Sequence, residues 1–186
     1  MKIAALMLST LLVAGCTGAI QPNTETRLDS ELAVLDFNDS ADAYLERPTF
    51  VSLVERYGSG KMLSIKVDLY GTDSHLYVPL ESSADVTSMI DKYLSWQETA
   101  TERGDQIEKE ISTVDGWGAF KLKGIFFSGG VGRHFLVINQ CAMGCIGASS
   151  EDYFYFDKSN AQHFKKLIHD MQSGRLKMLD VDSIYK

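Results

Sequence analysis

Three cysteines have the most distinctive chemistry in this 186-residue chain. Cys16 follows an apolar run near the N-terminus, whereas Cys141 and Cys145 are separated by three residues. Redox-active dithiols normally have two intervening residues, and haem attachment needs a His where this chain has Ile146. A zinc site would need two further ligands. In an oxidising compartment the pair instead favours a disulfide, in a segment that turns at Gly144.

A glycine-rich segment is the second place where chemistry is to be expected. Residues 128–133 read Ser-Gly-Gly-Val-Gly-Arg, without the Lys-Ser/Thr of a P-loop or the third spaced glycine of a dinucleotide loop. Glycine permits the positive φ of tight turns, so one interpretation is a hairpin tip and nothing more. Arg133 and His134 also offer contacts for an anion or a carbonyl. The candidate binding loop is therefore Gly129, Gly130, Gly132, Arg133 and His134.

The N-terminus has the pattern of a secretory signal peptide. Lys2 supplies a positive start, and the apolar run from residue 3 to residue 14 is shorter than the about 20 residues that cross a bilayer. The run ends in Val13-Ala14-Gly15-Cys16, which resembles the lipobox of bacterial lipoproteins. The resemblance covers residues 1–16 only. It implies removal of residues 1–15 and acylation of Cys16, which becomes the mature N-terminus.

The resemblance also implies a location and a first partner. Thr17 stands where lipoproteins of the inner membrane typically carry Asp, which places the anchor in the outer membrane of a Gram-negative cell, facing the periplasm. Each buried CH₂ group contributes about 0.8 kcal/mol, so three acyl chains hold the protein in the bilayer. Residues 16–30 are polar and are expected to form a flexible tether.

Composition predicts one globular domain over residues 31–186. The chain is 45% hydrophobic and 23% charged, as is usual for a folded protein. Removing Lys2 with the signal leaves 17 basic against 25 acidic side chains, a formal charge of −8. An acidic domain lacks the clustered basic face that nucleic acid needs. The expected partners are therefore the bilayer, through acylated Cys16, and a protein of the envelope or periplasm.

The periodicity of apolar residues predicts an α+β fold, with an antiparallel sheet of about five strands and helices packed on one face. The expected strands are two hairpins, 63–69 with 75–80 and 120–127 with 134–140, and an aromatic strand over 153–156. Helices are expected over 50–57, from Ser82 or Ser83 to about residue 100, and over 159–171, where Ser159 and Gln162 resemble a capping box. Residues 39–46 suggest a helical turn, 107–111 continue an apolar face, and 176–185 suggest a last strand.

The sequence contains neither Gly-x-Ser-x-Gly nor His-Glu-x-x-His, and it predicts no cofactor and no metal site. The leading hypothesis is a non-catalytic envelope lipoprotein whose periplasmic domain binds another protein. It is either a secretion accessory or pilot subunit, or an immunity protein, whose acidic charge would suit a basic effector. The alternative is a periplasmic hydrolase or ligand-binding enzyme acting on wall or lipid components, with Arg133, His134 and a carboxylate as its site.

Overall fold

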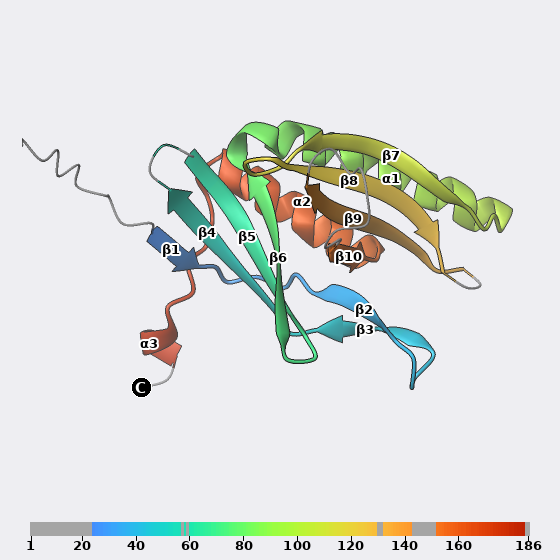
Figure 1. Ribbon diagram of the computed structural model, residues 1–186, viewed down its shortest axis with the longest axis horizontal. Coiled ribbons are helices and arrows are strands. Elements are labelled where there is room, and N and C mark those ends of the chain that lie inside the picture. The colour runs from blue at the N-terminus through green and yellow to red at the C-terminus, as the bar shows by residue number, and fades with distance from the viewer. Residues whose placement is uncertain (1–23, 57, 59, 130–131, 143–151, 185–186) are drawn as a thin grey trace, which may run out of the picture.

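The computed structural model describes residues 24–56, 58, 60–129, 132–142 and 152–184. Within these ranges the strands form two antiparallel sheets (Figure 1). The small sheet contains, in spatial order, Thr24–Arg27 (β1), Thr49–Arg56 (β4), Gly60–Leu69 (β5) and Thr72–Pro79 (β6). The large sheet contains Ala43–Arg47 (β3), Val34–Asn38 (β2), Asp152–Phe156 (β10), His134–Ala142 (β9), Phe120–Ser128 (β8) and Glu108–Asp115 (β7).

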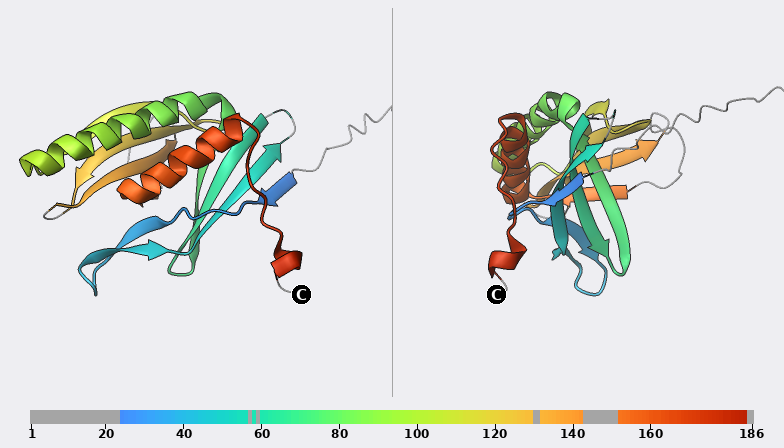
Figure 2. Two further views of the ribbon diagram at one scale, coloured as in Figure 1. Left: turned by 180° about the vertical axis from the view of Figure 1, so that it is seen from behind. Right: turned by 90° about the vertical axis from the view of Figure 1, so that its left-hand side faces the viewer.

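Helices Ser83–Arg103 (α1) and Lys158–Gln172 (α2) cover one face of the large sheet, as the rear view in Figure 2 shows. A 3-10 turn, Leu80–Ser82 (η1), leads into α1, which ends at Gly104 with a φ of 70°, a conformation that favours glycine. Helix α2 is capped by Asp157, whose carboxylate accepts from the Asn160 N–H. The expected capping box at Ser159 is therefore wrong. A short helix, Val181–Ile184 (α3), lies near the C-terminus.

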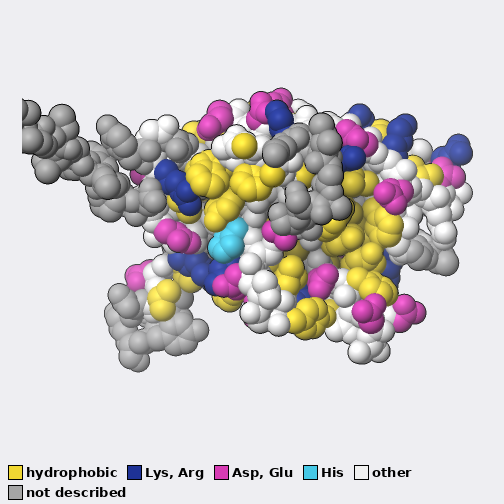
Figure 3. All heavy atoms as spheres, viewed as in Figure 1, with side chains coloured by type: hydrophobic (Ala, Val, Ile, Leu, Met, Phe, Trp, Pro, Cys, Tyr) yellow, Lys and Arg dark blue, Asp and Glu magenta, His cyan; other side chains and the backbone are white. Residues whose placement is uncertain are grey.

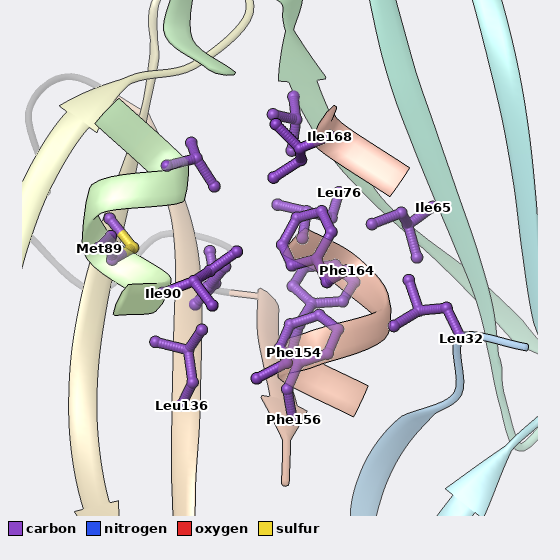
Figure 4. Close-up of a cluster of buried hydrophobic side chains, with 14 of the residues drawn as sticks. Leu32, Ile65, Leu76, Met89, Ile90, Leu136, Phe154, Phe156, Phe164 and Ile168 are labelled. Atoms are coloured by element: carbon purple, nitrogen blue, oxygen red, sulfur yellow. The ribbon is translucent and has the colours of Figure 1, made fainter. Parts of the chain in front are cut away.

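One hydrophobic core joins both sheets to α1 and α2 (Figure 4). Ile65 and Leu76 come from the small sheet, and Leu136 and Phe154 from the inner face of the large sheet. The helices add Met89, Ile90, Phe164 and Ile168. The two sheets and both long helices therefore share one main core.

The predicted class, α+β with antiparallel strands and helices, is confirmed. Both predicted hairpins are present as β5–β6 and β8–β9, and the aromatic strand is β10. The single sheet of about five strands is wrong, because the described residues form sheets of four and six strands.

The helix expected over residues 50–57 is instead strand β4. Its apolar residues fit a helical spacing, but β4 pairs with β1 on one side and β5 on the other, and Val51, Ser52 and Val54 are buried on its two faces. A strand with buried side chains on both faces loses the alternation that identifies a half-exposed strand. Thr49, Val51 and Val54 are also β-branched, which favours a strand.

Four other expectations differ from the structure. The suggested helical turn over 39–46 is the turn and second strand of the β2–β3 hairpin, and residues 108–111 form the first half of β7. The tail contributes a single bridge between Met178 and Leu28 and the short α3, not a strand. Part of the expected tether is ordered, because β1 pairs with β4 and Leu28 is buried. The fold therefore begins no later than Thr24, not at residue 31.

Candidate functional site: an aromatic face and the pocket at its end

Strand β9 is buried on both faces, which reveals a second apolar layer on the side of the large sheet opposite the helices. Leu136 and Ile138 face the main core, whereas Phe135 and Val137 point the other way. We call the outer layer the aromatic face. It consists of Leu35, Phe37, Tyr44, Ile125, Phe127, Phe135, Val137, Tyr153 and Tyr155.

Tyr44 is the centre of the aromatic face. Its ring centroid lies 4.4 Å from that of Phe135, 5.1 Å from Tyr155 and 5.2 Å from Phe37. Gly129 packs directly beside it, because a Cβ there would lie 3.1 Å from ring carbons of both Tyr44 and Phe127. Gly129 is thus needed for close approach, not for an unusual backbone angle.

Part of the aromatic face is open to solvent. Phe37 is 40% exposed and Tyr153 is 41% exposed, and Figure 3 shows hydrophobic side chains gathered over this side of the large sheet with acidic side chains around them. Burial, followed by the carboxylates of Asp36 and Glu108, raises the pKa of the Tyr155 phenol. This face therefore combines exposed rings with nearby carboxylates.

A pocket of about 480 Å³ lies at one end of the aromatic face. We call it the end pocket. Leu35, Tyr44 and Phe135 form its apolar wall, and the other lining residues are Gln97, Gly132, Arg133, His134, Asp157, Lys158 and Ser159. The wall and the aromatic face share three residues, so the two features form one continuous surface.

The end pocket exists because the large sheet is interrupted. Strand β10 ends at Phe156, and its only registered pair with β2 is Tyr155 with Leu35. The chain then turns into α2, so the first residues of β9 have no strand between them and the β2–β3 hairpin. The space that remains is bordered by the hairpin, α1, the start of α2 and the β8–β9 tip.

His134 is the most buried polar side chain of the end pocket, with 6% of its surface exposed. Its ring stacks on Phe126, with a centroid distance of 5.4 Å, and its Nδ1 lies 3.0 Å from the Ser128 hydroxyl. The Tyr93 hydroxyl donates to the His134 carbonyl at 2.8 Å, which ties the start of β9 to α1. Burial lowers the pKa of His134, which favours the neutral imidazole.

The charged residues around the end pocket largely offset one another. The Asp157 carboxylate accepts from the backbone N–H of Asn160 at 2.8 Å and from its side-chain amide at 3.0 Å. Lys158 pairs with Glu98 on α1 at 3.6 Å. Arg133 is exposed at the rim. The positive end of α2 is thus already capped by an acidic side chain.

Another cavity of about 480 Å³ lies between α1 and β7, and several of its polar side chains already have partners. Lys92 donates to the Ile111 carbonyl at 3.0 Å, Lys121 pairs with Asp115, and Ser88 donates to the Ala84 carbonyl. Within the described ranges, no three His, Cys, Asp or Glu side chains converge to hold a metal ion. No helix in the described part of the chain is long and apolar enough to cross a membrane.

The structure separates the two candidate sites proposed from the sequence. Gly132, Arg133 and His134 line the end pocket, and Gly132 has a φ of 73° at the hairpin tip. Cys141 is buried near the opposite end of β9. Cys16, Gly130 and Cys145 lie outside the described residues, so the acylation and the bridge stay predictions.

Sequence reasoning missed Tyr44, Gln97 and Asp157. Leu35 and Phe37 alternate with Asp36 and Asn38, and Tyr44 follows in a second short run, which is a hairpin signal that was available in the sequence. Gln97 stands in the buried stripe of α1, four residues after Tyr93 and three before Ala100, so the available signal was a polar residue at an apolar position. No protein-family model, curated protein or solved structure matches this chain.

Proposed function

We propose that this protein is a lipid-anchored envelope protein of the secretion-accessory or immunity type, whose periplasmic domain binds another protein without catalysis. Acylated Cys16 would hold it in the outer membrane, and the aromatic face would be its docking surface. The observation that carries the proposal is the exposed part of that face, centred on Tyr44, because clustered exposed rings on a domain surface are typical of interaction sites.

The charges beside the aromatic face indicate the chemistry of the partner. In the strand register, Glu46 lies opposite Leu35 on β2, and Glu108 lies opposite Phe127 on β8. Registered partners in antiparallel strands share one face of the sheet, so carboxylates stand at both sides of the aromatic face. Such a surface suits a protein segment that presents apolar anchors flanked by Lys or Arg.

The aromatic anchors are partly fixed before any partner arrives. Tyr44, Phe135 and Tyr155 are packed against one another and against Phe127, so their rings need little further ordering. Preorganised aromatic side chains contribute contact area at a low entropic cost. Phe37 and Tyr153 lie at more exposed positions, where a partner can cover them.

The proposal is tested by co-purification of the full lipidated chain from detergent-solubilised native envelopes. The wild type is compared with Phe37→Ser/Tyr153→Ser, which removes the two most exposed rings of the aromatic face. We expect a basic partner protein to be recovered with the wild type, and its recovery to fall at least about tenfold with the double variant. Raising the salt from about 0.05 M to about 0.5 M should also reduce recovery.

Met178→Ser is the matched control, because Met178 is also an exposed apolar residue, 50% exposed, but lies outside the aromatic face. It should recover the partner as the wild type does. Equal recovery with the double variant, or recovery that is unaffected by salt, contradicts the proposed docking surface.

A further inference from the structure

Only a short piece of chain lies between the proposed lipid anchor and the small sheet. Strand β1 begins at Thr24 and pairs with β4, so residues 17–23 alone separate Cys16 from the sheet. Because a chain spans at most about 3.6 Å per residue, Cys16 and Thr24 can be no more than about 29 Å apart. The acyl chains would therefore hold the small sheet close to the bilayer surface.

One face of the small sheet is turned away from the main core, and we call it the tether-side face. The strand register places Arg27 and Tyr77 in one row across the sheet, and Phe50 and His75 in the next row. Trp117 reaches this face from the turn between β7 and β8, because its ring lies 5.6 Å from that of Tyr77. The tether-side face consists of Arg27, Phe50, Arg56, His75, Tyr77 and Trp117.

The tether-side face combines partly exposed rings with guanidinium groups. Cζ of Arg27 lies 4.2 Å from the ring centroid of Phe50, and Cζ of Arg56 lies 4.2 Å from that of Trp117. Figure 3 shows hydrophobic side chains beside a histidine and Lys or Arg side chains over the small sheet. Trp and Tyr are the side chains enriched at the polar interface of a bilayer, and Arg binds phosphate.

The two arginines are not neutralised by carboxylates of the described residues. Within those ranges Arg27 and Arg56 form no ion pair, whereas Lys66, on the same side of the sheet, pairs with Asp73 at 2.7 Å. The other carboxylates on this side are those of Glu25 and Asp68. The surface is thus nearly balanced in charge but has two guanidinium groups without a counter-ion, which suits lipid phosphates more than adsorption by net charge.

A short tether makes even weak contact with the bilayer sufficient. Linking two binding elements through a short flexible chain gives an effective concentration of millimolar order. A face whose own dissociation constant for the bilayer is about 1 mM would then be docked for about half of the time. The partly exposed rings and two arginines therefore need to supply only a modest affinity.

We propose that the tether-side face docks on the phospholipid headgroups of the leaflet that holds the acyl chains. Arg27 and Arg56 would bind lipid phosphates, and Tyr77 and Trp117 would lie at the interface. The inference rests on the acylation of Cys16 in the proposed function. It does not depend on the protein partner of the aromatic face.

Fluorescence quenching tests this contact with the full lipidated chain. The chain is reconstituted in vesicles of phosphatidylethanolamine and phosphatidylglycerol, with and without a brominated phosphatidylcholine. Trp96→Phe leaves Trp117 as the only tryptophan, and Trp117→Phe leaves Trp96, which packs on Phe126 of the large sheet. We expect brominated lipid to quench at least about half of the Trp117 emission and to leave that of Trp96 nearly unchanged. No quenching of Trp117, or equal quenching of both, overturns the proposal.

Charge variants in the Trp96→Phe background connect the quenching to the guanidinium groups. Arg27→Gln/Arg56→Gln should lower the ratio of docked to undocked protein at least about tenfold. Arg133→Gln is the matched control, because Arg133 is an exposed arginine at the β8–β9 tip that also has no ion pair within the described ranges. It should leave the quenching unchanged. Unchanged quenching in the double variant, or an equal loss with Arg133→Gln, overturns the assigned face.

The outcomes separate this inference from the proposed function. Phe37→Ser/Tyr153→Ser should keep the Trp117 quenching while it loses the partner protein, and loss of quenching in that variant would overturn the tether-side face. If mass spectrometry shows acylated Cys16 and Trp117 is not quenched, the docking is wrong and the anchor stands. If Trp117 is quenched and no partner protein is recovered, the docking stands and the protein partner is wrong. A chain without acyl groups overturns both the anchor and the docking.

Discussion

The side-chain amide of Gln140 on β9 hydrogen-bonds the backbone N–H of Tyr77 on β6, with a distance of 3.0 Å between Oε1 and N. The same amide donates from Nε2 to the His75 carbonyl at 2.9 Å. Strand β6 is an edge strand of the small sheet, so its outward backbone groups have no neighbouring strand among the described elements. One side chain of the large sheet thus completes the edge of the small sheet and fixes their relative position.

Gln140→Leu should lower the free energy of unfolding by about 2 kcal/mol, because it leaves an N–H and a carbonyl of β6 without their partner. Urea denaturation of the variant and the wild type measures this difference. Gln162→Leu is the control, and at its exposed position it should change stability by less than about 0.5 kcal/mol. Equal stability of Gln140→Leu and the wild type would mean that this contact does not hold the sheets together.

Gly124→Ala should be destabilising by about 1–3 kcal/mol, because the Met89 side chain of α1 fills the space that a Cβ on β8 would need. The added Cβ would lie 2.3 Å from the Met89 Sδ and 2.7 Å from its Cγ. In a double-mutant cycle, Met89→Ala should relieve most of that cost, so the two substitutions together should be less harmful than their sum. Strict additivity in thermal or urea unfolding is the contrary result.

Burial of His134 should make part of the stability depend on pH. Its pKa is lowered in the folded protein, whereas the unfolded chain takes up a proton near the ordinary histidine value of about 6.5. The contribution of the buried neutral imidazole to the free energy of unfolding is therefore complete above that pH. It is lost as the pH falls below that value, by at most about 1.4 kcal/mol per pH unit. The difference in unfolding free energy between the wild type and His134→Gln isolates this contribution from the carboxylates. A difference that is constant from pH 8 to pH 5 contradicts a lowered pKa.

Cys16→Ser should abolish acylation and leave an uncleaved precursor that still carries residues 1–15. Intact-protein mass spectrometry distinguishes the acylated wild type from the precursor. A wild-type product without acyl chains, beginning at a residue other than Cys16, would overturn both the anchor and the outer-membrane placement.

Cys141 and Cys145 should be joined in a disulfide. Purified protein, denatured without reductant, is therefore expected to show no reactive thiol at either position, and two thiols after reduction. A loop this short contributes only about 2 kcal/mol in the chain-entropy model, so the reduced protein should remain folded. Titration of two thiols before reduction refutes the bridge.

The sequence by itself determined the features that depend on neighbouring residues. The alternation of apolar and polar residues in β5 predicted a strand. The i, i+3, i+4 spacing of Val86, Met89 and Ile90 predicted a helix. Both patterns arise because only one side of the element has to be apolar. The signal-like N-terminus with Cys16 is likewise a local pattern. The alternating aromatic residues of β10 also implied two different faces, and Phe154 and Phe156 are indeed in the core.

Only the tertiary structure decided how these elements meet. Strand β4 acquires its identity from β1 and β5 on either side, and its own apolar spacing is compatible with a helix. The end pocket brings together Tyr44, Gln97, His134 and Asp157, which are far apart along the chain. These residues come together because β10 ends early and because α1 and α2 pack on the sheet. Contacts between residues so far apart in sequence produce no periodic pattern that sequence analysis could detect.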